Sequence, residues 1–163
     1  MKRTRVAERE REAERASHRP STVVAKGGTP PATVLVADDD GALRAALRSI
    51  LVQDGYDVVE TSDGAETLSF LGDAADGHGV APDILVLDVC MPELSGLGIL
   101  SAMKRLSIPI PTIVMTAFSD RSVDVLAHKL GALRVLHKPF ELEDVRAAVL
   151  DAALHSPRAA RRR

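Results

Sequence analysis

The sequence predicts an α/β fold in which a parallel sheet is covered by helices on both faces, the doubly wound arrangement. Five short apolar runs alternate with segments whose apolar residues recur at the helical period, as successive β-then-α units do. The 163 residues include no Trp, one Tyr and three Phe, so aliphatic side chains must fill the interior. Right-handed crossovers between consecutive strands make such a sheet parallel.

The expected strands are short runs rich in Val, Ile and Leu. The first, TVLVA, stops at three consecutive Asp, and the second, DVVET, follows an Asp-Gly turn signal. The third, DILVLD, is an almost continuous apolar run, which is typical of a central parallel strand. IPTIVMT and LRVL complete the set. The expected strands cover residues 33–37, 57–61, 83–88, 110–116 and 133–136.

Each expected helix follows one strand and carries apolar residues three or four positions apart. In the first helix Leu43, Leu47 and Ile50 recur at this spacing. The second helix is followed by a Gly- and Asp-rich stretch, residues 72–82, which is expected to be a surface loop. Gly131 is well placed to cap the end of the fourth helix. The expected helices cover residues 41–53, 63–71, 95–106, 119–130 and 141–154.

The composition excludes several classes of protein. A single cysteine leaves no disulfide framework and no Cys-rich zinc site. No apolar run reaches the roughly 18 residues that a membrane span requires. The charged N-terminus lacks the apolar stretch of a secretory signal. We therefore expect a cytoplasmic protein that does not contact a membrane.

Charge and composition divide the chain into three expected parts. Residues 1–30 begin with seven Lys/Arg and four Glu and continue as a linker rich in Pro, Gly, Ser and Thr, so we expect a disordered tail. Residues 31–154 form the folded domain. Its acidic excess, 10 basic against 19 acidic residues over 21–154, suits a bound cation or a basic partner. Residues 155–163 form a tail with four Arg.

Residues with reactive or charged side chains follow the ends of the expected strands. Asp38 and Asp39 follow the first strand, Asp88 ends the third, Thr116 ends the fourth, and Lys138 follows the fifth. Ligands of doubly wound folds bind at this edge of the sheet. Converging carboxylates repel one another unless a cation neutralises them, and Mg²⁺ takes one or two carboxylates together with phosphate oxygens. A lysine and a hydroxyl nearby are suited to holding a phosphoryl group.

Four motifs in order carry a resemblance to a known family. VLVADDD, DILVLDVCMPELSG, IPTIVMTAFSD and HKPF resemble the receiver (CheY-like) domain of bacterial two-component response regulators, over residues 33–154. The resemblance implies a flavodoxin-like sheet of strand order 2-1-3-4-5. It also implies a signalling module rather than an enzyme, with Mg²⁺ as its cofactor.

The resemblance assigns a role to each residue that matches a motif. Asp88 matches the phosphoacceptor, whose carboxylate attacks the phosphorus of a phosphohistidine to give an acyl phosphate. Asp38 and Asp39 match the acidic pair, with Asp39 as the direct Mg²⁺ ligand and Asp38 acting largely through water. Asp88 and the backbone carbonyl of Cys90 complete the protein ligands.

The remaining matches concern the phosphoryl group itself. Lys138 matches the lysine that pairs with a phosphoryl oxygen, and Thr116 matches the hydroxyl that turns toward another. In this family the bond between this lysine and Pro139 is commonly cis.

Three positions depart from the better-known pattern. Val135 occupies the place of the switch aromatic, which puts coupling of Thr116 to an aromatic rotamer in doubt. In this family, the residues at the positions of Cys90 and Phe118 flank the path of the water that hydrolyses the acyl phosphate. A thiol and a bulky ring orient water poorly, so we expect slow self-dephosphorylation.

Each of these residues also has a purely structural interpretation. Asp40, and with it the other two Asp, could cap the first helix. Thr116 could be an ordinary strand-end hydroxyl, Lys138 a solvated surface lysine, and Cys90 a small buried hydrophobe. His137, beside the lysine, is expected to be exposed rather than catalytic.

Because few residues lie outside the receiver, we expect either a stand-alone, single-domain response regulator without a DNA-binding domain or a fragment of a longer regulator. It would take its phosphoryl group from a sensor histidine kinase or a histidine phosphotransferase. The acyl phosphate would then bias binding of a partner, or of a second copy, at the face formed by residues 119–154.

Three alternatives stay open at this point. The first is a receiver-like interaction module that works independently of phosphorylation. The second is a phosphohydrolase, which is disfavoured because Cys90 stands where a second Asp would be needed. The third is nucleic-acid binding through the Arg-rich ends.

Overall fold

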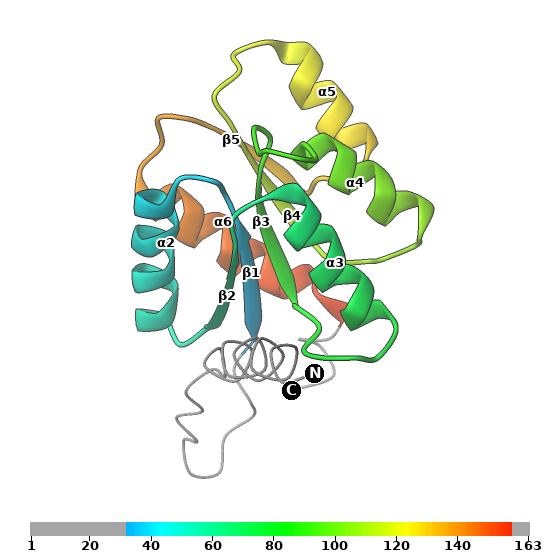
Figure 1. Ribbon diagram of the computed structural model, residues 1–163. Coiled ribbons are helices and arrows are strands. Elements are labelled where there is room, and N and C mark those ends of the chain that lie inside the picture. The colour runs from blue at the N-terminus through cyan, green and yellow to red at the C-terminus, as the bar shows by residue number, and fades with distance from the viewer. Residues whose placement is uncertain (1–31, 158–163) are drawn as a thin grey trace, which may run out of the picture.

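Five parallel strands form one sheet in the computed structural model, which describes residues 32–157 (Figure 1). The strands are β1 (Thr33–Ala37), β2 (Asp57–Thr61), β3 (Ile84–Asp88), β4 (Thr112–Thr116) and β5 (Arg134–His137). Their order in the sheet is β2-β1-β3-β4-β5, which confirms the order that the sequence resemblance implies. The expected tail over residues 1–30 lies outside the described residues.

Helices cover both faces of this sheet. The helices are α2 (Gly41–Gln53), α3 (Gly64–Ala75), α4 (Gly96–Arg105), α5 (Arg121–Lys129) and α6 (Leu142–His155). Helices α2 and α6 lie on one face, and α3, α4 and α5 lie on the other (Figure 1). The direction of the chain across the sheet therefore reverses between β1 and β3, which is the point where doubly wound folds bind ligands.

Side chains that point alternately to the two faces of the sheet divide the hydrophobic core into two parts. On β1, Val34 and Val36 pack with α2 and α6, while Leu35 and Ala37 pack with α3, α4 and α5. All four side chains are fully buried. Because both faces are covered, the central strands β1, β3 and β4 consist of buried residues throughout, as the continuous apolar runs predict.

Side chains cap the helices that begin near the carboxyl ends of the strands. The Asp40 carboxylate accepts hydrogen bonds from Ala42 N at 2.9 Å and Leu43 N at 3.1 Å, so Asp40 caps α2 as the sequence predicts. Asp120 caps α5 in the same way. At the other end of α5, Gly131 has φ 106° and follows the C-cap, in agreement with its expected role.

Two element ends differ from the sequence prediction. Helix α3 does not stop at residue 71 but continues to Ala75, so the first residues of the expected loop are helical. Leu71 and Ala74 are both buried, which favours one more turn, and the chain leaves the helix at Gly77, where φ is 81°. Strand β4 begins at Thr112 rather than at residue 110, because Pro111 has no N–H to donate to a ladder.

The bounds of β1, β2 and α2 agree with the prediction, and the remaining boundaries differ from it by at most two residues. No helix within residues 32–157 combines the length and hydropathy that a bilayer span needs.

An ion pair joins the two helices on the α2–α6 face. Arg146 of α6 donates from Nε to Asp54 Oδ2 at 2.7 Å, and its Nη2 also contacts the same carboxylate. These hydrogen bonds hold the pKa of Asp54 below its ordinary value. Because the pKa of Asp54 is lower in the folded state, its ionised carboxylate stabilises the fold at pH values above the unfolded-state pKa. This contribution is lost as the pH falls through the folded-state pKa.

We therefore expect Asp54→Asn to lower the free energy of unfolding at neutral pH and to have a vanishing effect in acid. The measurement is urea unfolding of both proteins at several pH values between about 2 and 7. The pair is partly exposed, so the difference is small. An effect that grows as the pH is lowered would contradict this account.

Candidate functional site

The carboxyl ends of the strands bring four of the predicted site residues into direct contact or close proximity. Asp38 and Asp39 lie in the turn after β1, and Asp88 is the last residue of the neighbouring strand β3. Lys138 follows β5 and reaches across the edge of the sheet. Its Nζ lies 2.9 Å from Asp38 Oδ2 and 3.0 Å from Asp88 Oδ1.

Burial and charge make Asp88 an unusual carboxylate. Asp38 and Asp88 are both buried, and burial raises the pKa of Asp88 above its ordinary value. The hydrogen bond from Lys138 lowers this pKa, and the nearby charge of Asp38 raises it again. Burial also lowers the pKa of Lys138, but its hydrogen bonds to Asp38 and Asp88 outweigh that effect, so the net pKa is raised. The lysine therefore stays a cation between two acids.

Asp38 and Asp39 differ in how their carboxylates are used. Asp38 accepts from Lys138 and, through Oδ1, from Asp40 N at 2.8 Å, so both of its oxygens are engaged. Asp39 is exposed, and within residues 32–157 its carboxylate forms no hydrogen bond or ion pair.

These carboxylates fit a divalent cation with a preference for oxygen. Asp38, Asp39 and Asp88 each offer one oxygen, and the three oxygens lie within 4.8 Å of one another. Lys138 supplies one positive charge against three negative ones. The cluster thus retains negative charge in a partly buried place, and all of its ligand atoms are oxygens. The residues present therefore fit Mg²⁺.

Thr116 and Cys90 border this cluster. Thr116 is buried at the end of β4, and its Oγ1 accepts a hydrogen bond from Phe118 N at 3.0 Å. Cys90 is exposed, so its interpretation as a buried hydrophobe is wrong. Partial desolvation, followed by the charge of Asp88, raises the pKa of the Cys90 thiol. Phe118 is 49% exposed.

The other sequence expectations at this edge have mixed outcomes. The bond between Lys138 and Pro139 is cis, as the resemblance implies. Val135 is half-buried and packs against the core on the α3–α5 face. His137 is exposed, as expected, but both of its ring nitrogens have partners. Sequence reasoning missed this, because the partner residues come from other elements.

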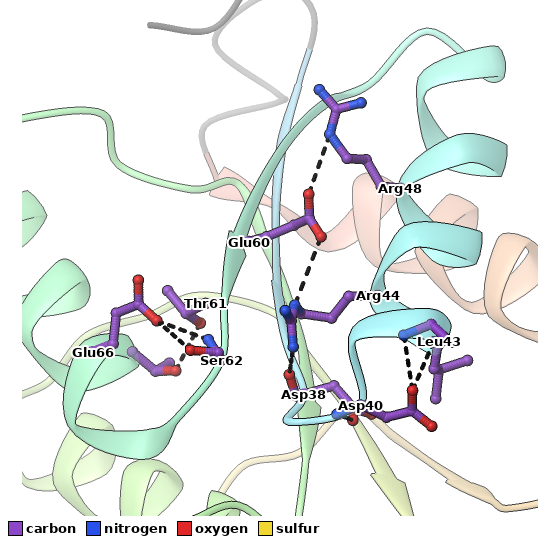
Figure 2. Close-up of polar contacts among 11 residues, drawn as sticks. Asp38, Asp40, Leu43, Arg44, Arg48, Glu60, Thr61, Ser62 and Glu66 are labelled. Carbon is purple, nitrogen blue, oxygen red and sulfur yellow. Dashed lines mark hydrogen bonds and ion pairs between the residues drawn. The ribbon is translucent and has the colours of Figure 1, made fainter. Parts of the chain in front are cut away.

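A partly buried arginine holds the turn that carries the acidic pair (Figure 2). Arg44 of α2 donates from Nη1 to the backbone carbonyl of Asp38 at 2.6 Å, and its Nε lies 3.7 Å from Glu60 of β2. Arg48 reaches the same Glu60 carboxylate at 3.3 Å. Of these two arginines, Arg44 alone contacts the turn, and it joins the Asp38 carbonyl on α2's side to Glu60 of β2. The sequence offers no signal for this contact beyond the spacing of six residues.

We expect Arg44→Met to lower the free energy of unfolding by about 1–2 kcal/mol, because the Asp38 carbonyl loses a charged donor in a buried place. Arg48→Met is the matched control. The Arg48 side chain is 52% exposed, against 19% for Arg44, and among residues 32–157 its one ion-pair partner is Glu60. Its loss should cost under about 0.5 kcal/mol. Urea unfolding measures both values, and equal losses would contradict the role of the Asp38 contact.

The fold and the site together define a class: a doubly wound α/β domain with a buried acid, an acidic cluster and a lysine at the switch point of its sheet. Residues 34–150 match the family of the response regulator receiver domain. The chain belongs to this family.

Named relatives agree with the match. The chain is 39% identical over 117 residues to the response regulator MprA of Mycolicibacterium vanbaalenii. The alignment covers 72% of this chain and 48% of MprA. It is 36% identical over 122 residues to the transcriptional regulatory protein PdtaR of Mycobacterium tuberculosis, covering 73% of this chain and 55% of PdtaR. The chain thus spans about half the length of these two relatives.

A solved structure shows the same fold. The response regulator receiver domain protein from Clostridium thermocellum superimposes with a TM-score of 0.68 at 29% identity. The alignment covers 76% of this chain and 95% of that one. Receiver domains of two-component response regulators are signalling modules, and this chain contains one.

Proposed function

We propose that this receiver accepts a phosphoryl group on Asp88 from a sensor histidine kinase or a histidine phosphotransferase, and that the modification switches binding of a partner. The single observation that carries the proposal is the buried Asp88 carboxylate, held 3.0 Å from the Lys138 ammonium beside two further acids. A purely structural role for Asp88 would not require two further carboxylates and a lysine beside it.

Asp39, Asp38, Asp88 and the backbone carbonyl of Cys90 would hold Mg²⁺ in this proposal. When bound, the cation neutralises the acidic cluster and attracts phosphate oxygens. The free carboxylate of Asp39 makes it the direct ligand, whereas Asp38, whose oxygens are both engaged, acts through water.

The residues of the chain then divide the work of the transfer. An Asp88 oxygen attacks the phosphorus of the donor phosphohistidine, the P–N bond breaks, and the electron pair leaves with the imidazole, which takes up a proton. Lys138 exchanges its contact with Asp88 for one with a phosphoryl oxygen. Thr116 turns its hydroxyl toward a second phosphoryl oxygen. Neither Cys90 nor Phe118 orients a hydrolytic water, so the acyl phosphate decays slowly.

The partner would bind on the face of α5, β5 and α6. Exposed apolar side chains occur on both helices, Val125 and Leu126 on α5 and Leu150 and Leu154 on α6. A second copy of this chain is one candidate partner. The protein would act in the cytoplasm, where kinases form phosphohistidine from ATP.

A second candidate function is an interaction module that does not depend on phosphorylation. The observation that favours it is Val135, an aliphatic side chain in place of the switch aromatic. Such a module would bind Mg²⁺ but would show no change in partner affinity on modification.

The test is intact-protein mass spectrometry after incubation with acetyl phosphate. We expect one added phosphoryl group in the presence of Mg²⁺, none after chelation, and an adduct that persists for longer than seconds. An unmodified protein, with acetyl phosphate and with a histidine kinase donor alike, would overturn the proposal.

A further inference from the structure

A continuous chain of hydrogen bonds connects Thr116 to helix α5. Thr116 Oγ1 accepts from Phe118 N at 3.0 Å, and the carbonyl of the same Phe118 lies 3.0 Å from His137 Nδ1. His137 Nε2 lies 3.1 Å from Asp124 Oδ2, in the first turn of α5. Three bonds therefore join the end of β4, the β4–α5 loop, the end of β5 and the helix.

His137 is the central residue of this series of hydrogen bonds, because among its four residues His137 is the one that bonds both to the β4–α5 loop and to helix α5. Its two partners are the Phe118 carbonyl and the Asp124 carboxylate, which belong to different elements. The other oxygen of Asp124, Oδ1, is buried and accepts no hydrogen bond among residues 32–157. Asp124 consequently depends on His137 for its pairing.

The surroundings leave the loop room to move. Ala117, Phe118, Ser119, Arg121, Asp124, His137 and Lys138 line a hollow of about 280 Å³ beside this chain. Phe118 itself is 49% exposed. By contrast Val135, in the interior of β5, has no polar group with which to sense the Thr116 hydroxyl.

We propose that His137 is a positioning residue that transmits the state of Thr116 to α5, in place of an aromatic switch. This inference rests on the proposed function. When the Thr116 hydroxyl turns toward a phosphoryl oxygen, the Phe118 amide loses its acceptor and the loop shifts. The Phe118 carbonyl then moves relative to His137, and the His137–Asp124 pair passes this movement to α5.

The experiment follows backbone amide NMR signals while Mg²⁺ and beryllium fluoride, an analogue of the phosphoryl group, are added to the full chain. Two sets of amides report separately: Val89 and Cys90 beside Asp88, and residues 122–129 of α5. In the wild-type protein we expect both sets to shift. In His137→Ala we expect the first set to shift as before, and the α5 shifts to fall at least about two-fold.

Three further variants separate transmission from a general loss of structure. Asp124→Asn keeps an acceptor for His137 and should retain the α5 response, whereas Asp124→Ala should lose it. His155→Ala is the matched control, because His155 also bonds through Nδ1 to a backbone carbonyl, that of Asp151, but far from the loop. We expect it to respond like the wild type.

The outcomes separate this inference from the proposed function. If Val89 and Cys90 shift in every protein and α5 shifts equally in His137→Ala, then transmission through His137 is wrong while the phosphoryl site stands. If the wild-type protein shows no shift at Val89 and Cys90 and gains no phosphoryl group from acetyl phosphate or a kinase, the proposed function fails and this inference fails with it.

Discussion

Asp88→Asn should gain no phosphoryl group under conditions in which the wild-type protein gains one. The substitution keeps the size and shape of the side chain but replaces the attacking carboxylate oxygen with an amide, which is a poor nucleophile. Lys138 retains Asp38 as a partner at 2.9 Å, so the lysine stays in place. Intact-mass measurement with acetyl phosphate and Mg²⁺ reports the result directly.

The same variant should remain folded, and without Mg²⁺ it should be at least as stable as the wild type. Burial raises the pKa of Asp88 in the folded state. Ionisation of this carboxyl group therefore destabilises the fold as the pH rises above its unfolded-state pKa. An uncharged Asn removes that cost together with the repulsion from Asp38. Thermal unfolding in chelator checks the expectation.

Asp40→Asn is the matched control for this experiment. It makes the same chemical change two residues after Asp38, and Asn caps a helix about as well as Asp does. Asp40 already uses one carboxylate oxygen to cap α2. We expect Asp40→Asn to gain the phosphoryl group like the wild type. Modification of Asp88→Asn to the same extent would mean that another residue is the acceptor.

The sequence was most informative where local pattern and topology agree. Five apolar runs predict the strands, and a parallel sheet brings the residues that follow those runs to one edge. The strand ends therefore predict that Asp38, Asp88 and Lys138 lie near one another, and in the structure Lys138 forms ion pairs with both acids. Position along the chain was sufficient here, because strand ends in a parallel sheet meet by geometry.

The sequence was less informative where a contact depends on how two elements pack. The partners of His137 come from α5 and from the β4–α5 loop, and no spacing in the chain predicts them. The same holds for Arg44 and Glu60, which meet only because α2 packs beside β2. The exposure of Cys90 depends on the path of the β3–α4 loop. The Gly- and Asp-rich stretch that begins at Gly72 predicts a loop, but helix α3 continues through Gly72 to Ala75.

The β3–α4 loop also explains the second large effect that we expect, at Gly96. The amide of Gly96, the first residue of α4, donates to Val89 O at 3.0 Å, so the loop folds back closely on the end of β3. A Cβ at this position would collide with the carbonyl oxygen of Asp88 and lie 3.1 Å from Val89 Cα. Both are backbone atoms, so no side-chain rotation relieves the clash.

We expect Gly96→Ala to lower the free energy of unfolding by about 3 kcal/mol, because either α4 or the backbone of Asp88 must shift. Gly72→Ala is the matched control. Gly72 lies inside α3, and nothing lies within 4 Å of the added Cβ, so the substitution should stabilise the protein by about 0.5–1 kcal/mol. Urea unfolding measures both changes, and a neutral Gly96→Ala would mean that the loop tolerates displacement. The added Cβ would clash with the backbone oxygen of Asp88, so Gly96→Ala should also gain the phosphoryl group more slowly. Gly72→Ala should gain it at the wild-type rate.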